Sequence, residues 1–413
     1  MIDASLYDRC VRCGLCLTSC PTYLETMTET SGPRGRISLM KAVAEGELAE
    51  DSPGYVAQMS ECLGCRACEA VCPSGVPYGE LIEAARASLH TSAEERPPQR
   101  NARALAAVLD AVERPAVMYA GARFLRFAQR SGILALFART GMLRAFGFAD
   151  AVRLAPPIDA RFDLPDGLVQ RAPKSRGRAF LHLGCIAQCT STNVHRAASK
   201  LLLIGGLDVV RSREQRCCGA LAAHAGQLER AKVLAKANIA AFESSGADVI
   251  VFDAAGCGAQ CKSYAQLLSD DDAWAPRARA FVERTRDITE VLDACDLPAP
   301  TLPLQARVAY QEPCHLAHAQ KVTGAPKRLL ASIPELQLVA LEEATLCCGG
   351  AGLYSLGEPE MSARLRERKA AAIARSGAEI VATANVGCSL QLRAAIAPIP
   401  VRHVVELLAD AYQ

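Results

Sequence analysis

The sequence predicts an α+β protein of several domains, and three observations in its 413 residues carry that prediction. A spacing of four cysteines occurs twice in the first 73 residues. A stretch of helical periodicity, rich in arginine and apolar residues, follows. The rest is an internal repeat in which strand-like runs alternate with helical segments, the pattern of an α/β sheet. A chain this long exceeds one ordinary domain, and we expect units over residues 1–98, 99–174, 175–298 and 299–413.

The repeated spacing is C-x2-C-x2-C-x3-C-P, formed by Cys10, Cys13, Cys16 and Cys20 before Pro21 and by Cys62, Cys65, Cys68 and Cys72 before Pro73. In bacterial ferredoxins with this spacing, the fourth cysteine of each run ligates the other of two 4Fe–4S clusters. We therefore expect one cluster on Cys10, Cys13, Cys16 and Cys72, and a second on Cys62, Cys65, Cys68 and Cys20. Zinc is the alternative, but four zinc ligands need neither the third C-x2-C step nor the proline. Two adjacent clusters indicate electron transfer.

Composition excludes several other classes of protein. The formal net charge of +2 argues against a nucleic-acid-binding surface over the whole molecule. Nineteen cysteines in metal-like clusters are unlike the disulfide framework of a small secreted domain. The N-terminus lacks a basic region followed by an apolar one, and no apolar run is long enough for a transmembrane helix. We expect a cytoplasmic protein, in which thiolates stay free to bind iron.

Helical periodicity links and follows the two cysteine motifs. Gly and Pro indicate a turn over residues 31–36, and a helix is expected over residues 37–47. Another helix is expected over residues 81–89, with an end at residues 96–98. The helix expected between the two cysteine motifs, with the helix that follows them, predicts a helical ferredoxin domain.

Residues 99–155 predict basic amphipathic helices. Leu105, Val108, Leu109 and Val112 form one apolar stripe, and a second pattern comprises Phe124, Phe127, Ile133, Leu134, Leu136 and Phe137. The polar positions are mostly Arg114, Arg123, Arg126, Arg130, Arg139 and Arg144. Such helices either lie on an anionic membrane or acidic partner, or pack on their own domain with the arginines in solvent. Pro156, Pro157 and the residues to Lys174 indicate a linker.

The C-terminal part repeats itself with an offset of 129 to 131 residues. Cys185 corresponds to Cys314, Cys217-Cys218-Gly219 to Cys347-Cys348-Gly349, and Cys257 to Cys388. In both halves a helix, expected over residues 229–244 and 360–375, precedes a buried-type strand. The repeat predicts a duplicated α/β unit with mostly parallel strands.

Each half can bring together four thiols at strand ends, where α/β sheets place their ligand sites. The first set is Cys185, Cys217, Cys218 and Cys257; the second is Cys314, Cys347, Cys348 and Cys388. These sets fit a further iron–sulfur cluster, a structural zinc ion, or a metal-free redox dithiol, and one half can also have degenerated. Cys189 and Cys261 occur only in the first half, and Cys295 is expected in the core. His182, His224, His315 and His318 flank these sets, where capping or surface positions are the simpler interpretation.

The arrangement of two ferredoxin motifs before two Cys-Cys-Gly motifs resembles a known family over nearly the whole chain: the iron–sulfur subunits of bacterial glycolate oxidase. Its relatives include the corresponding subunit of anaerobic glycerol-3-phosphate dehydrogenase, the lactate-utilisation iron–sulfur protein and heterodisulfide reductase. The resemblance is most specific over residues 312–320, 347–349, 382–388 and 391–392. Unlike heterodisulfide reductase, the halves end in Cys257-x3-Cys261 and in Cys388 without a further cysteine, so heterodisulfide chemistry is not carried over.

The resemblance implies an electron-transfer subunit of glycolate oxidase (glycolate dehydrogenase). Glycolate would become glyoxylate on FAD-binding flavoprotein subunits, and electrons would pass through this chain towards a quinone, with the complex peripheral at the inner face of the cell membrane. The chain shows no G-x-G-x-x-G between a strand and a helix, which agrees with a flavin on a partner. A lactate or glycerol-3-phosphate dehydrogenase subunit and a thiol–disulfide reductase acting at a Cys-Cys-Gly site are the alternatives.

Overall fold

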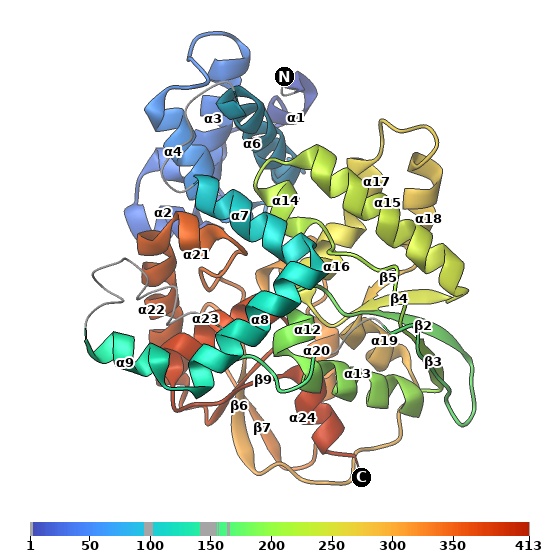
Figure 1. The fold of residues 1–413 in the computed structure, drawn as a ribbon. Coiled ribbons are helices and arrows are strands. Elements are labelled where there is room, and N and C mark those ends of the chain that lie inside the picture. Colours follow the sequence, from blue (N-terminus) through green and yellow to red (C-terminus); the bar gives the residue numbers. More distant parts are fainter. Residues whose placement is uncertain (1–2, 95–101, 141–154, 156, 163–165, 413) are drawn as a thin grey trace.

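The computed structural model describes residues 3–94, 102–140, 155, 157–162 and 166–412. An N-terminal helical unit, a set of linking helices and two α/β units pack against one another in this part of the chain (Figure 1). The N-terminal unit is at the top of Figure 1, and the linking helices run across the front. Residues 96–98, Arg144 and Pro156, at which a helix end, a basic face and a linker are expected, lie outside the described residues.

The N-terminal unit consists of short helices that leave the cysteine motifs in the loops between them. They are α1 (Ala4–Tyr7), a 3-10 turn (Leu17–Ser19), α2 (Pro21–Thr26), a second 3-10 turn (Glu29–Ser31), α3 (Pro33–Ala44), α4 (Pro53–Glu61), α5 (Ala67–Ala70) and α6 (Tyr78–Glu94). Their core contains Met40, Tyr55, Met59, Leu81 and Ile82, all nearly inaccessible to solvent.

The expected turn over residues 31–36 is wrong in its second half. Helix α3 already begins at Pro33, because proline fits the first helical position, where no amide hydrogen bond is lost. Gly35, which suggested a turn, is needed for a different reason. A Cβ atom at Gly35 would lie 2.1 Å from the carbonyl oxygen of Glu29, so the close approach of two backbones requires glycine here.

The linking helices are α7 (Ala102–Glu113), α8 (Pro115–Arg130) and α9 (Ile133–Arg139). Leu109 of α7 is buried, and Gly132, with φ of 77°, makes the turn between α8 and α9. None of the helices in the described residues is long and apolar enough to span a bilayer.

The first α/β unit contains a five-stranded sheet with the order β1-β3-β2-β4-β5, in which only β1 is antiparallel. Its elements are β1 (Val169–Gln170), β2 (Gly177–His182), α12 (Ala187–Thr190), α13 (Thr192–Ile204), β3 (Leu207–Val210), α14 (Ala220–His224), α15 (Leu228–Ser245), β4 (Val249–Phe252), α16 (Ala255–Lys262), α17 (Tyr264–Leu267), α18 (Ala275–Glu283), β5 (Thr285–Asp287) and α19 (Ile288–Ala294). Strand β1 lies in the segment expected to be a linker, because two residues show no periodicity.

The second unit contains the parallel sheet β7-β6-β8-β9, which is the order of the first sheet without its edge strand β1. Its elements are β6 (Ala306–Tyr310), a π-helical turn (His315–Ala319), α20 (Gly324–Ala331), β7 (Leu336–Val339), α21 (Tyr354–Gly357), α22 (Pro359–Ser376), β8 (Ile380–Thr383), α23 (Val386–Ile396), β9 (Val401–His403) and α24 (Val404–Asp410). The duplication and its mostly parallel strands are confirmed.

The two halves share one core. Helix α13 of the first unit packs on α24 of the second, and the equivalent helices α19 and α20 pack on each other. Leu181 and Leu201 of the first half belong to the same buried cluster as Val308, Leu330 and Leu408 of the second. This pseudo-symmetric packing brings the ends of β4 and β8 together, since the amide of Ala255 donates to the carbonyl oxygen of Ala384 at 3.1 Å.

Candidate metal centres

A cavity in the N-terminal unit is lined by Cys10, Cys13, Cys16 and Cys72, the four cysteines expected at the first cluster, and also by Cys68. These residues come from two loops more than 50 residues apart in sequence. The amide of Val76 donates to Sγ of Cys72 at 3.5 Å. The side chain of Arg34 also lines the cavity and donates to the carbonyl oxygen of Arg12 at 2.9 Å. Four cysteines around one space fit a cubane cluster.

A second cavity is lined by Cys20, Cys62, Cys65 and Cys68, the set expected at the second cluster. All four cysteines are buried, whereas Cys13 of the first cavity is exposed. The amide of Gly64 and the hydroxyl of Tyr78 each donate to Sγ of Cys62, at 3.4 and 3.7 Å. Such hydrogen bonds to sulfur help to set the reduction potential of a cluster.

Backbone conformation explains how each loop turns three cysteines inwards. Arg12 and Gly14, on either side of Cys13, have φ of 56° and 82°. Gly64 and Arg66 flank Cys65 in the same way, with φ of 63° and 61°. Left-handed conformations are rare for residues other than glycine and gather at functional sites. The two loops therefore repeat one conformation as well as one spacing.

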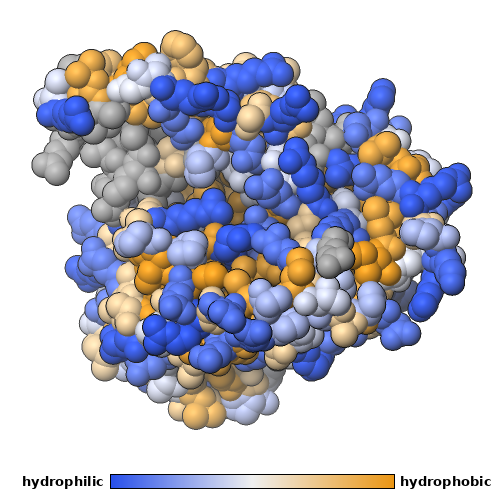
Figure 2. All heavy atoms as spheres, turned by 90° about the horizontal axis from the view of Figure 1, so that it is seen from below, coloured by the Kyte–Doolittle hydropathy of each residue, from blue (hydrophilic) through white to orange (hydrophobic). Residues whose placement is uncertain are grey.

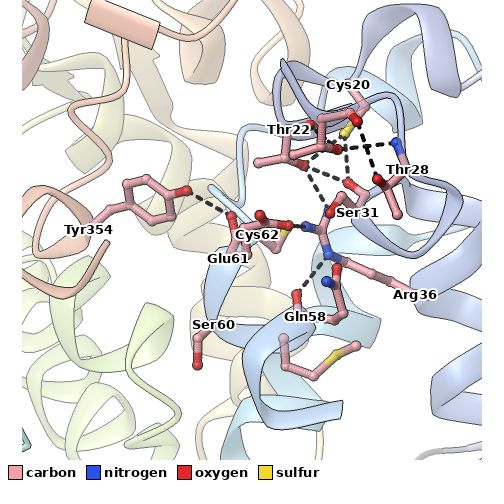
Figure 3. Close-up of polar contacts among 12 residues, drawn as sticks. Cys20, Thr22, Thr28, Ser31, Arg36, Gln58, Ser60, Glu61, Cys62 and Tyr354 are labelled. Atoms are coloured by element: carbon pink, nitrogen blue, oxygen red, sulfur yellow. Dashed lines mark hydrogen bonds and ion pairs between the residues drawn. The ribbon is translucent and has the colours of Figure 1, made fainter. Parts of the chain in front are cut away.

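Arg36 of α3 is a buried cation beside the second cavity, with 1% of its surface exposed (Figure 3). It donates to the carbonyl oxygen of Gln58 at 2.7 Å, to Oγ1 of Thr22 at 3.1 Å and to Oε2 of Glu61 at 2.8 Å. Burial opposes the charge, but Tyr78, Cys62 and Cys20 keep the pKa of Arg36 raised. A fixed positive charge here stabilises the negative charge of cysteine-ligated iron.

The first Cys-Cys-Gly set gathers where β2 and β4 end. Sγ of Cys217 lies 3.7 Å from Sγ of Cys185. Hydrogen bonds from Cys185 and Cys218 hold the pKa of Cys217 well below its usual value, and Cys218 in turn contacts Cys257. All four expected thiols therefore meet. Asn238 and Tyr264 support the Cys-Cys pair by donating to the carbonyl oxygens of Cys217 and Cys218, at 2.9 and 2.8 Å.

The second set gathers in the same way. Hydrogen bonds from Cys347 and Cys388 lower the pKa of Cys348 well below its usual value, and Cys314 contacts Cys347. Gly349 has φ of 81°, and a Cβ atom there would lie 2.7 Å from the carbonyl oxygen of Ser362. In the described part of the chain, no three His, Cys, Asp or Glu side chains surround a point suited to a single metal ion.

The two Cys-Cys-Gly sets differ in the charge of one neighbouring residue. Lys369 of α22 is buried beside Cys348, and it donates to the carbonyl oxygens of Glu343 and Ala344. Burial lowers the pKa of Lys369, an effect that Cys348 and Cys347 oppose. The equivalent residue in the first half, 131 positions earlier, is the neutral Asn238. Only the second set therefore has a lysine at this position.

The loop of the second cavity packs on the second Cys-Cys-Gly set. Leu63, Cys65 and Cys347 belong to one buried cluster, and Cys314 packs against it. Nε2 of His315 lies 3.0 Å from the carbonyl oxygen of Gly64. The hydroxyl of Tyr354 donates to the carbonyl oxygen of Glu61 at 2.9 Å (Figure 3). Burial raises the pKa of Cys65, and Cys314 raises it further.

Several residues have roles that their place in the sequence did not indicate. His315, expected at a cap or the surface, is half-buried between units, and loss of solvation there lowers its pKa to about 4. His224 contacts it edge-on, with ring centres 5.5 Å apart, and pairs with Glu83 at 3.2 Å. Arg36 and Lys369 gave no local signal, because a buried cation is defined by tertiary contacts. Cys189 lies away from the first set, in a cluster with Ala122.

Comparison with protein families supports this organisation. The 4Fe-4S dicluster domain family matches residues 7–76, and the cysteine-rich domain family known as CCG matches residues 179–262 and 308–393. The chain is thus a two-cluster iron–sulfur protein with a duplicated cysteine-rich domain, and it carries two 4Fe–4S clusters.

The similar proteins include the probable glycolate oxidase iron-sulfur subunit of Bacillus subtilis, 38% identical over 97% of this chain and 93% of that protein. The glycolate oxidase iron-sulfur subunit of Escherichia coli is 32% identical over 99% of this chain and 95% of that protein. Lactate utilization protein A of an Exiguobacterium species is 30% identical over 56% of this chain and 96% of that protein. The chain belongs to the family of glycolate oxidase iron–sulfur subunits.

Among solved structures, a hypothetical protein from Helicobacter pylori aligns with a TM-score of 0.53. The alignment covers 92% of this chain and 67% of that one, at 9% sequence identity. This similarity concerns the fold alone.

Proposed function

We propose that the chain transfers electrons within a glycolate-oxidising complex, from FAD-binding flavoprotein subunits towards a quinone. The observation that carries this proposal is the contact between the second ferredoxin-type loop and the second Cys-Cys-Gly set, because it joins cysteine sites of two domains into one series. Glycolate as substrate follows from the two relatives that align over nearly their whole length. The lactate-utilisation relative aligns with 56% of this chain and gives weaker support for lactate.

The ligand sets in this proposal are those that line the two cavities. Cys10, Cys13, Cys16 and Cys72 hold the first cluster, and Cys62, Cys65, Cys68 and Cys20 hold the second. Each set combines three cysteines from one loop with the last cysteine of the other. When bound, the clusters supply one-electron chemistry, and the chain fixes their spacing and surroundings.

Electrons enter, in this proposal, at the first cavity. Cys13 is exposed there, and Val11 and Leu15 expose 68% and 56% of their surface around it. An exposed ligand with an apolar rim suits close contact with a redox partner. The second cavity, with all its cysteines buried, then connects this entry with Cys314 of the second half.

The second Cys-Cys-Gly set, Cys314, Cys347, Cys348 and Cys388, is the site at which we propose a further iron–sulfur group. Its thiols meet, Lys369 balances their negative charge, and it adjoins the second cavity. The first set, Cys185, Cys217, Cys218 and Cys257, has the thiols without that lysine or that contact. A metal-free dithiol in the first set is compatible with the proposed transfer.

The experiment is co-expression of the chain with candidate FAD-binding flavoprotein subunits, anaerobic purification, and electron paramagnetic resonance after addition of glycolate. We expect reduced-cluster signals within the complex. Cys13→Ala should abolish signals of the first cluster, whereas Cys295→Ala, which removes a cysteine outside all four sets, should not. Failure of the flavoproteins to co-purify, or clusters that dithionite reduces but glycolate does not, would contradict the proposal.

A further inference from the structure

Helix α8 has apolar side chains on two opposite faces, and only one of them is covered by the described part of this chain. On the inner face, Ala122 packs with Ile158 and Cys189, and Met118, Tyr119 and Leu125 adjoin that cluster. The hydroxyl of Tyr119 donates to Oε1 of Gln188 at 2.6 Å, and Arg126 donates to the carbonyl oxygen of Ile158 at 2.6 Å. These contacts fix which way the helix faces.

The outer face exposes large apolar side chains at helical spacing. Val117, Phe124 and Phe127 expose 49%, 73% and 62% of their surface. Helix α9 continues this face with Leu136, which is 58% exposed, and with Ile133 and Phe137. We call these six residues the α8–α9 face. In Figure 2 apolar side chains gather at the upper left, on the side where α8 and α9 lie. An apolar face of this kind on a helical pair marks an interaction surface.

The charge of the residues around the α8–α9 face indicates what this face binds. Between Glu113 and Asp150 the sequence contains six arginines and no acidic residue, although the whole chain has a formal net charge of only +2. Arg123 and Arg130 of α8 lie on one side of the exposed stripe, as their helical positions require, and Arg114 precedes the helix as its N-cap residue. Arg123 also lies over the ring of Phe162, 5.7 Å from its centre.

We propose that the α8–α9 face docks on a membrane surface that carries anionic phospholipids. Phenylalanine and leucine enter the boundary of the acyl chains, and the flanking arginines bind headgroup phosphates. The basic border and the apolar stripe therefore act together in binding. An acidic protein partner is the alternative occupant, and the experiment below distinguishes it from a membrane.

This inference rests on the proposed function for its purpose, because a quinone acceptor lies in the membrane, but its geometry is independent of electron transfer. The helices α8 and α9 are too short to cross a bilayer, and they would lie along its surface. The chain would thereby be held where electrons leave the complex.

The test is sedimentation of the anaerobically purified, cluster-loaded chain with quinone-free vesicles. Vesicles of phosphatidylglycerol and phosphatidylcholine are compared with phosphatidylcholine alone. We expect binding to the anionic vesicles that decreases with added salt. The double variant Arg114→Glu/Arg130→Glu should weaken it about 10-fold or more. Its matched control is Arg279→Glu/Arg284→Glu, at two exposed arginines of and beside α18, which should bind as the unaltered chain does.

The apolar contribution has its own pair of variants. Phe124→Ser/Phe127→Ser should also weaken binding about 10-fold or more. Val233→Ser, at a residue of α15 that is 67% exposed, should leave binding unchanged. All variants should keep the cluster signals of the unaltered chain, which excludes loss of folding.

Two outcomes would overturn this inference: no binding of the unaltered chain to anionic vesicles, or equal binding by the α8 variants. If the α8 variants instead lose a flavoprotein partner, the face is a protein interface and the membrane proposal is wrong. Because the vesicles contain no quinone, a complex that glycolate reduces but that does not bind vesicles contradicts this inference alone.

Discussion

His315 and Gly64 meet across the domain boundary, with Nε2 of the histidine 3.0 Å from the carbonyl oxygen of the glycine. Gly64 lies between Cys62 and Cys65, and His315 directly follows Cys314. One contact therefore joins the loop of the second cluster to the second Cys-Cys-Gly set. The electron route proposed here depends on this junction.

The exchange of the fourth cysteines between clusters can be tested by substitution. We expect Cys72→Ala to change the same paramagnetic signal as Cys13→Ala, because both residues line the first cavity. Cys20→Ala should change the other signal, together with Cys65→Ala. If Cys20→Ala altered the signal that Cys13→Ala alters, each loop would hold its own cluster and the assignment would be wrong.

Arg36→Met should affect both stability and potential. Loss of this buried cation leaves Glu61 without its 2.8 Å partner, and breaking a buried pair destabilises a protein by about 3 kcal/mol. Removal of a positive charge should also make the second cluster harder to reduce, so that its potential becomes more negative. A redox titration followed by paramagnetic resonance measures this. The control is Arg34→Met, which removes a half-buried arginine at the first cavity and should leave the second potential unchanged.

Two glycines of the Cys-Cys-Gly motifs provide a matched pair. Gly219 and Gly349 have φ of 83° and 81°, so alanine should cost about 1–2 kcal/mol at either position. At Gly349 the new methyl group would also lie 2.7 Å from a carbonyl oxygen, whereas at Gly219 the nearest atom is 3.4 Å away. Chemical denaturation should show the larger loss for Gly349→Ala. Equal losses would show that the second loop relaxes around the methyl group.

Asp287 makes stability depend on pH. It caps α19 by accepting from the amide of Thr289 at 2.9 Å, yet its complete burial raises the carboxyl pKa from 3.8 to about 7. The folded chain therefore holds this proton more tightly than the unfolded chain, and the contribution to stability decreases as pH rises from about 4 to 7. Asp287→Asn keeps a capping side chain without the charge. It should stabilise the protein at pH 8 by about 2–4 kcal/mol.

Thermal unfolding of Asp287→Asn and the unaltered chain at several pH values measures this difference. The difference in free energy of unfolding between the two proteins should become small as pH falls towards 4. His403 occupies the equivalent cap in the second half, and burial lowers its pKa to about 4. Its contribution to stability therefore increases as pH rises, and it is the same in Asp287→Asn and in the unaltered chain. A constant difference between pH 5 and pH 8 would contradict the raised pKa of Asp287.

The sequence predicted most of what depends on local spacing. The cysteine runs, the repeat offset and the helices before β4 and β8 are properties of neighbouring residues, and each is found. Residues defined by tertiary packing were not predicted. Arg36 was expected in a turn and Lys369 fell within an expected helix, with no local sign that either is buried, and nothing local placed His315 against Gly64. For residues 99–155 the sequence left two interpretations open. In the described residues 102–140, α8 packs on its own chain with one face, and contact of the exposed face with a membrane or a partner stays a prediction.

The most direct test of the account is the metal content of the anaerobically purified chain, measured together with its paramagnetic signals. We expect about eight iron atoms and as many acid-labile sulfides from the two ferredoxin-type sites. Iron in excess of that number should disappear in Cys347→Ser/Cys348→Ser, and the two reduced clusters should show magnetic interaction. Zinc without acid-labile sulfide, or iron at background level, would contradict the account.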